Sequence, residues 1–268
     1  MMKKYLLFFL TFIGLLPALK GQEVIDVMRY EYQVTFRPSI KDSLHVKEKV
    51  FLDVWNNNSR FYSEDRAKLI DFLAEDKNVH FRSEMVYPSD VKAGNMNWTV
   101  VKESDKVFLV FKVGSTIIKT EDKLASIEWS ILDGNELYEG LTVQKAVGNW
   151  KGRNWSVWFT QDIPLIEGPY KFKNLPGFVV KAVDDNEEYL FEFIEARKEK
   201  ITANYFGYDN ALLANEKELS RIRKVALSKT LKMVLEEKGI IVNTKDNPDL
   251  EASLNEKVED NYNHIEIL

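Results

Sequence analysis

Apolar and polar residues alternate without a break from Met28 to Arg37. Because successive side chains of a strand point to opposite faces, this pattern predicts a β-strand with one buried face. That face would consist of Met28, Tyr30, Tyr32, Val34 and Phe36. A second strand is predicted from Val46 to Trp55, and its inward residues would be Val46, Val50, Leu52 and Val54. The two strands are expected to pair as antiparallel neighbours.

Shorter segments of the same kind follow along the chain. A short helix is predicted after Ser63, which is a suitable N-cap because acidic residues follow it. Further strands are predicted at residues 79–87, 97–101, 107–113, 123–132, 141–147, 155–160, 178–183 and 189–195. In segment 123–132 the apolar set is Ala125, Ile127, Trp129 and Ile131. This succession predicts a mainly β (α+β) protein built on a twisted antiparallel sheet or open barrel.

The period of the apolar residues changes from two to 3.6 between Asn215 and Lys238. The change predicts one long helix, with Asn215 as its N-cap and Gly239 as its C-cap. We expect this C-terminal helix, residues 215–240, to pack on an antiparallel β domain formed by residues 22–214. Residues 241–268 are rich in Asp, Asn and Glu, so a flexible acidic tail is expected there.

The first residues have the features of an export signal. Two lysines precede an apolar run from Tyr5 to Leu16, and the small residue Gly21 follows it. The run is shorter than the roughly 20 apolar residues that a membrane-spanning helix requires. We therefore expect a signal peptide over residues 1–21 and no transmembrane span in the mature chain. The expected location is the periplasm, the outer membrane or the outside of the cell.

Charge and composition narrow the class of partner. Loss of residues 1–21 would remove three lysines and no acid, so the formal net charge would change from −5 to −8. An acidic chain lacks the basic surface that nucleic-acid binding requires. The chain has no Cys, so thiolate nucleophiles and Cys-based zinc sites are excluded. With 268 residues, 45% of them hydrophobic, it can bury a stable core without disulfides.

The stretch from Asn149 to Phe193 carries the most specific motif of the chain. It contains Gly168-Pro169-Tyr170-Lys171-Phe172 and, one residue later, Asn174-Leu175-Pro176-Gly177. Pro presets φ and Gly accepts a positive φ, so a type II turn with Gly177 at positive φ is predicted at residues 175–178. Seven signature residues are expected to be structural: Gly168, Pro169, Tyr170, Phe172, Leu175, Pro176 and Gly177.

These motifs resemble the signature of the GLPGLI family, which are secreted proteins of Bacteroidetes-type bacteria. The segments Gln144-Lys145-Ala146 and Trp158-Phe159-Thr160-Gln161-Asp162-Ile163-Pro164 fit the same pattern. The chain departs from it at Val143, where the family often has Cys, and at Asn174, where the family name begins with Gly. The family has no assigned activity, so the resemblance implies secretion without implying a function.

Motifs for catalysis or metal binding are absent from the sequence. It contains no His-Glu-x-x-His, no Gly-x-Ser-x-Gly and no glycine loop of the phosphate-binding kind. The three histidines, His45, His80 and His264, fit surface or strand positions better than ligand positions. Acidic clusters at residues 184–188 and 246–251 are explained by a hairpin turn and by the tail. We therefore expect no cofactor and no bound metal ion.

Aromatic residues crowd the signature region, and strand alternation cannot place all of them on one face. They would either pack in an ordinary core or line a groove for an apolar or peptide ligand. The candidate binding residues are Trp155, Trp158, Tyr170 and Phe172.

Two functional hypotheses follow from these features. The first is an exported, envelope-associated binding or scaffold protein, with an aromatic-lined sheet face that takes an apolar or peptide ligand or an envelope protein. The alternative is an exported hydrolase whose dispersed active site uses Arg153, Asp162, Tyr170 and Lys171.

Export predicts that the mature protein begins near Gln22, because cleavage would follow the small residue Gly21. N-terminal sequencing of the protein recovered from its own host measures this directly. A protein that still begins at Met1 would contradict the prediction.

Overall fold

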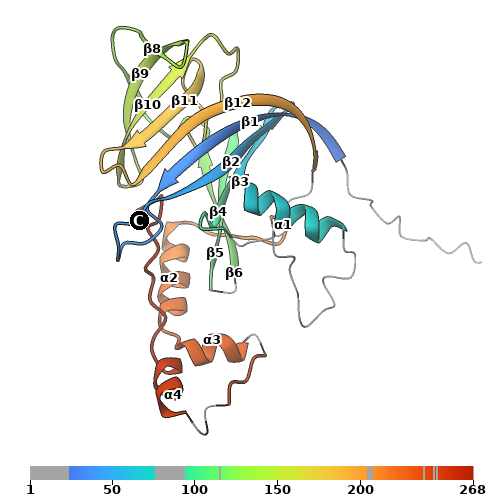
Figure 1. Ribbon diagram of the computed structural model, residues 1–268, viewed down its shortest axis with the longest axis vertical. Coiled ribbons are helices and arrows are strands. Elements are labelled where there is room, and N and C mark those ends of the chain that lie inside the picture. Colours follow the sequence, from blue (N-terminus) through green and yellow to red (C-terminus); the bar gives the residue numbers. More distant parts are fainter. Residues whose placement is uncertain are drawn as a thin grey trace, which may run out of the picture.

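A computed structural model describes residues 24–75, 94–114, 116–203, 208–237, 239–243, 245 and 247–267. Within them, thirteen strands form one sheet, in the order β13-β6-β5-β4-β3-β2-β1-β12-β11-β10-β9-β7, with β8 paired to β9 (Figure 1). The first six strands are β1 (Val24–Phe36), β2 (Val46–Trp55), β3 (Asn58–Ser63), β4 (Trp98–Glu103), β5 (Lys106–Val113) and β6 (Thr116–Lys123). The others are β7 (Ser130–Ile131), β8 (Glu136–Tyr138), β9 (Leu141–Trp150), β10 (Arg153–Thr160), β11 (Phe178–Asp184), β12 (Tyr189–Thr202) and β13 (Leu212–Leu213). The predicted signal peptide and the predicted strand at 79–87 lie outside the described residues.

The predicted β fold is confirmed, and β1 is its central strand. β1 pairs antiparallel with β2 on one side and with β12 on the other. Four residues of the predicted apolar face, Tyr30, Tyr32, Val34 and Phe36, lie in the main core. Arg29 and Glu31 of the opposite face are buried as well, because that face is also covered. Among the strands of the described residues, only the short β13 is parallel to its neighbour, β6.

The sheet curls around the loop that joins β10 to β11, which we call the signature loop (residues 161–177). The ring of Tyr170 in this loop lies 5.6 Å from Trp98 of β4 and 6.3 Å from Trp155 of β10, measured between ring centroids. In the strand order, β4 and β10 are six steps apart, which would separate them by about 29 Å in a flat sheet. One ring can contact both only because the sheet bends into an open barrel with the signature loop on its concave side.

A helix covers the convex side of the sheet. This helix, α1 (Glu64–Glu75), packs beneath β2 and β3 (Figure 1). Ser63 caps it as predicted, because its hydroxyl accepts a hydrogen bond from the amide of Arg66 at 3.2 Å. The second core between helix and sheet consists of Phe51, Tyr62, Ala67, Ile70, Val101, Phe108, Val110 and Ala211.

The predicted single helix over residues 215–238 is wrong, because two helices occupy this stretch. They are α2 (Glu216–Leu227) and α3 (Leu231–Glu237). Ser228 caps the end of α2, and the hydroxyl of Thr230 accepts from the amide of Met233 at 3.3 Å to start α3. Thr230 also bridges to Lys257, so contact with a distant segment fixes the break that the apolar period did not reveal.

The predicted ends of this region are confirmed. Asn215 forms a capping box with Glu218, and Gly239, at φ +74°, follows the last turn of α3. Among the described residues, no helix is long and apolar enough to cross a membrane.

The expectation of a loosely ordered tail is wrong for residues 247–267. They contain helix α4 (Pro248–Leu254) and a final segment that returns to the sheet. Asn263, Ile265 and Glu266 are all at least 95% buried. The acidic composition suggested that this segment could not offset the entropy lost when a chain becomes ordered. Burial of Ile265 and a set of specific polar contacts offset that loss.

The predicted strand at 123–132 is also wrong, since β6 ends at Lys123 and only Ser130–Ile131 forms a strand. The alternating apolar residues instead anchor a loop. Ile127 is buried in the main core, and the indole of Trp129 donates to the side chain of Asn174 at 2.9 Å. Of the four apolar residues in the predicted pattern, Ile127 is buried and Trp129 is half-buried, whereas Ala125 and Ile131 are exposed, so the alternation predicted neither the strand nor its buried face.

Gly177 does not have the predicted positive φ, and no type II turn forms there. A Cβ on Gly177 would lie 2.4 Å from the carbonyl oxygen of Thr160, and one on Gly168 would lie 2.4 Å from that of Phe172. Both signature glycines are therefore required by close backbone approach. The residue of the signature loop with positive φ is Tyr170, at +52°.

Replacing Gly177 by Ala should lower the free energy of unfolding by about 1–3 kcal/mol, the usual cost of overpacking, because the backbone of Thr160 cannot move aside cheaply. Gly134→Ala is the matched control. Gly134 has φ +92° and open space around it, so its penalty should be only the backbone strain of about 1 kcal/mol. Urea unfolding compares the two, and a smaller loss for Gly177→Ala would contradict this explanation.

Candidate functional site

The signature loop fills the concave side of the sheet with side chains. Phe172 packs its ring 4.8 Å from that of Trp155, and both residues, like Tyr170, are at least 99% buried. Trp158, the fourth candidate binding residue, points to the opposite face, where Lys145 and Lys181 place their amines 4.9 and 5.3 Å from its ring. Three of the four candidates thus lie inside the core, so they do not line an open groove.

A buried ion triad holds the start of the signature loop against the sheet. The Glu167 carboxylate accepts from the amines of Lys102 in β4 and Lys173 in the loop, each at 2.6 Å, and from the hydroxyl of Ser59 at 3.2 Å. Burial alone raises the pKa of Glu167, but the charges of Lys173 and Lys102 outweigh it and hold that pKa below its ordinary value. Glu167 is therefore ionised and structural.

The middle of the signature loop is tied to the C-terminal segment. Lys171 and Tyr170 both donate to the same oxygen of Glu266, Tyr170 at 2.6 Å, and Lys171 also pairs with Asp122 at 2.6 Å. Burial, with the Glu266 charge adding to it, raises the pKa of Tyr170 well above its ordinary value. The indole of Trp150 donates to the Tyr170 hydroxyl at 3.1 Å, which completes the set of partners that holds this left-handed residue.

Arg153 forms a separate cluster with the C-terminal segment. It donates to Asp184 at 2.8 Å and to Glu188 at 2.7 Å, so the acidic hairpin at 184–188 serves this ion pair. It also donates to the side chain of Asn263 at 2.7 Å and to the carbonyl of His264 at 2.8 Å. This cluster fastens the end of the chain to the hairpin between β11 and β12.

The four residues of the hydrolase hypothesis do not meet at one place. The structure brings Tyr170 and Lys171 together at Glu266, while Arg153 binds the neighbouring C-terminal residues. The Asp162 carboxylate accepts the amide of Thr142 at 2.9 Å, on the far side of β10. Tyr170, Lys171 and Arg153 are buried in ion pairs or hydrogen bonds, which is the environment of structural groups.

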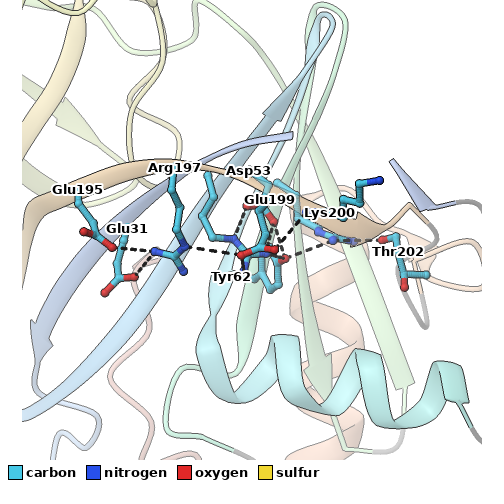
Figure 2. A network of polar contacts seen from close by, with 10 residues as sticks. Glu31, Asp53, Tyr62, Glu195, Arg197, Glu199, Lys200 and Thr202 are labelled. Carbon is cyan, nitrogen blue, oxygen red and sulfur yellow. Dashed lines mark hydrogen bonds and ion pairs between the residues drawn. The ribbon is translucent and has the colours of Figure 1, made fainter. Parts of the chain in front are cut away.

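Figure 2 shows another polar network, which sequence reasoning missed, on the convex face above α1. Arg29 donates to both oxygens of Asp53 at 2.7 and 2.9 Å, and Tyr62 donates to the same carboxylate at 2.5 Å. Arg197 stands directly opposite Arg29 on β12 and pairs with Glu31 at 2.8 Å. The sequence did carry a sign of this network, since Arg29 and Glu31 are charged residues on the polar face of the alternating β1 segment. Because each arginine faces an acid, the network ties neighbouring strands together.

A cavity of about 500 Å³ lies between α2, the edge of the sheet at β5 and β13, and residues 258–264. Most of its wall is apolar, formed by Val113, Leu212, Leu213, Ile222, Val225 and Ala226. The volume of this cavity is in the range of small-molecule binding sites in other proteins. The sequence analysis did not anticipate it, because its walls come from segments that are distant in the sequence.

Arg223 is one of three charged residues that α2 contributes to the wall of this cavity, with Glu218 and Arg221. It lies 5.8 Å from the ring of Phe111, and its Nε is buried without a hydrogen-bond acceptor among the described residues. Burial lowers the pKa of its guanidinium, although Asp260 and Glu266 oppose that effect. A signal was present in the sequence, since Arg223 interrupts the apolar stripe formed by Leu219 and Ala226.

The buried triad predicts an unequal response to the loss of its members. Glu167→Gln should lower the free energy of unfolding by about 3–5 kcal/mol, because it leaves two lysines buried without an anion. Lys173→Met should cost less, since Lys102 still balances Glu167. Glu195→Gln, in an exposed pair with Arg197, is the control and should change stability by no more than about 1 kcal/mol.

Urea unfolding at several pH values measures these differences. Because the folded pKa of Glu167 is lowered, its contribution is present above the unfolded pKa and is lost as pH falls through the folded pKa. Equal losses for Glu167→Gln and Glu195→Gln would contradict the structural role of the triad.

Comparisons with known proteins leave the site unassigned. No protein-family model matches the chain, and no curated protein matches it. Among solved structures, PNGF-II in a C2 crystal form is similar with a TM-score of 0.49 and 17% identity over 76% of this chain. The matched region is 34% of the PNGF-II chain, so this chain spans far less than that protein. A LolA superfamily protein from Nitrosomonas europaea has a TM-score of 0.26 and 8% identity, covering 64% of this chain and 86% of that one.

Proposed function

We propose that this chain is an exported, non-catalytic binding protein that holds an apolar ligand in the cavity between α2 and the edge of the sheet. The observation that carries the proposal is the cavity itself, about 500 Å³ in volume and walled mainly by aliphatic side chains. Exposed aliphatic side chains cost free energy in water, and a ligand that covers them recovers it. Leu212, Leu213 and Val225 are each more than half exposed at this wall.

The concave side of the sheet is not the site that we propose. Its interior is occupied by Tyr170, Phe172 and Leu175 of the signature loop, all at least 98% buried. A ligand there would have to displace these side chains together with the ion triad around Glu167. The proposed ligand site is therefore the cavity beside α2, whose lining includes none of these three side chains.

Binding is favoured over hydrolysis by the state of the ionisable groups. A nucleophile or general base needs an open path to a substrate. The Tyr170 hydroxyl and the Lys171 amine are instead buried against Glu266, and the Arg153 guanidinium is buried against Asp184. The resemblance to the GLPGLI family and the export signal supply the proposed location, the cell envelope or the space outside it.

Native mass spectrometry of the protein purified from its own host tests the proposal. We expect a mass above that of the mature chain, from a retained apolar molecule, and binding of the neutral dye Nile red to the stripped protein. Val225→Trp should weaken dye binding by about tenfold or more, because the larger ring occupies the cavity. Val225 is 53% exposed, so the fold should tolerate the substitution.

Lys217→Trp supplies the matched control. Lys217 is an exposed residue of α2 that does not line the cavity, so this variant should bind the dye as the wild type does. A bare mature mass together with dye binding that Val225→Trp leaves unchanged would overturn the proposal.

A further inference from the structure

The acidic side chains around the cavity already have partners within the described part of the chain. Glu237 pairs with Lys229 at 2.6 Å, and Asp260 pairs with His264 at 2.8 Å. Glu259 binds Lys41 at the surface. The fourth acid at this wall, Glu218, accepts the amide of Asn215 in the capping box at 2.9 Å. These carboxylates are therefore not the groups that would receive a charged ligand.

Lys229 is neutralised by Glu237, but three other cations of the same wall have no such partner. Lys112, Arg221 and Arg223 line the cavity, and none of them has an ion pair with another described residue. Lys112 and Arg221 are exposed at the rim, whereas Arg223 lies deeper, between α2 and the sheet. The wall therefore offers three cations without an ion-pair partner among the described residues, and these are the groups available to an anionic head group.

Arg223 adds a specific demand to this general preference. The Nε–H of its guanidinium is buried without an acceptor, so it has lost its hydrogen bond to water and forms none within the described residues. Such an unsatisfied donor costs free energy and is rare in native structures. The Phe111 ring beneath the guanidinium offers a weak cation–π contact but no acceptor lone pair. A carboxylate is the acceptor whose two oxygens match the planar donor edge of Arg.

We propose that the ligand of this cavity is a single-chain amphiphile with a carboxylate head, of the fatty-acid class. This inference rests on the proposed function, since it names the chemistry of the ligand held in the same cavity. The carboxylate accepts from Arg223, and Lys112 and Arg221 attract it from the rim. The hydrocarbon chain covers the aliphatic wall formed by Leu212, Leu213 and Val225.

The test compares three single-chain probes on the wild-type mature protein: dodecanoate, dodecanol and dodecyltrimethylammonium. The alkyl chain of dodecanoate is one methylene shorter than that of the other two, which works against the expected preference, so a tighter binding of dodecanoate has to come from its head group. Their dissociation constants follow from displacement of bound Nile red, below the concentration at which each forms micelles. We expect dodecanoate to bind about tenfold or more tightly than dodecanol, which is the scale of one charge-assisted hydrogen bond, and dodecyltrimethylammonium to bind weakest.

Two variants assign the head-group preference to Arg223. Arg223→Met keeps much of the aliphatic bulk and removes the charge, so dodecanoate and dodecanol should become nearly equal. Lys217→Met removes a cation from an α2 position outside the cavity and should leave the preference as in the wild type. Thermal unfolding of each variant establishes that it is folded before binding is compared.

The outcomes separate this inference from the function on which it rests. Equal dissociation constants of dodecanoate and dodecanol on the wild type would overturn the carboxylate assignment. If Val225→Trp at the same time weakens the binding of both probes, the proposed binding function still holds. A carboxylate preference that persists in Arg223→Met would overturn the role of Arg223. If none of the three probes binds the wild type, the inference and the proposed function both fail. If Arg223→Met does not fold, the comparison of the three probes on the wild type still tests whether the cavity prefers a carboxylate.

Discussion

A sheet that curls has an inside, and that inside must be filled. Here one loop, residues 161–177, adds Tyr170, Phe172 and Leu175 to the side chains of the strands, and Tyr170 contacts Trp98 of β4 and Trp155 of β10. Interiors pack as densely as organic crystals, so small shifts of such a loop would open voids or cause clashes. This explains why Gly168 and Gly177 stand where no Cβ fits, and why Phe172 lies directly against Trp155.

The same loop brings charge into the core, and the rest of the chain has to balance it. Lys173 is neutralised by Glu167, and Lys171 requires Glu266 from the far end of the chain. The C-terminal segment therefore completes the domain, since Ile265 packs in the main core and Glu266 neutralises Lys171. The interior is thus filled with side chains, and the cavity proposed for the ligand lies against α2.

Local patterns were read correctly where local forces decide the structure. The alternation through Tyr32 and the cap at Asn215 depend on neighbours within a few residues, and both were predictable. Three other features depend on contacts between distant segments: the curl of the sheet, the docking of Ile265 and the cavity beside Arg223. Gly177 illustrates the difference. A Pro-Gly pair indicates a turn, whereas the residue is required here because any Cβ would lie 2.4 Å from the carbonyl oxygen of Thr160 in β10. No period or motif contains that information.

Native-state hydrogen exchange tests most directly whether the signature loop is a fixed part of the core. The amide of Val179 donates to the carbonyl of Glu167 at 2.9 Å, and that of Phe172 donates to Pro169 at 3.2 Å. If the loop holds the sheet in its curled form, these amides should exchange only through global unfolding, with opening free energies within about 1 kcal/mol of those in β1. Exchange of these two amides through a local opening, with an opening free energy several kcal/mol below that of the β1 amides, would contradict this account. The concave side of the sheet would then be accessible to a ligand.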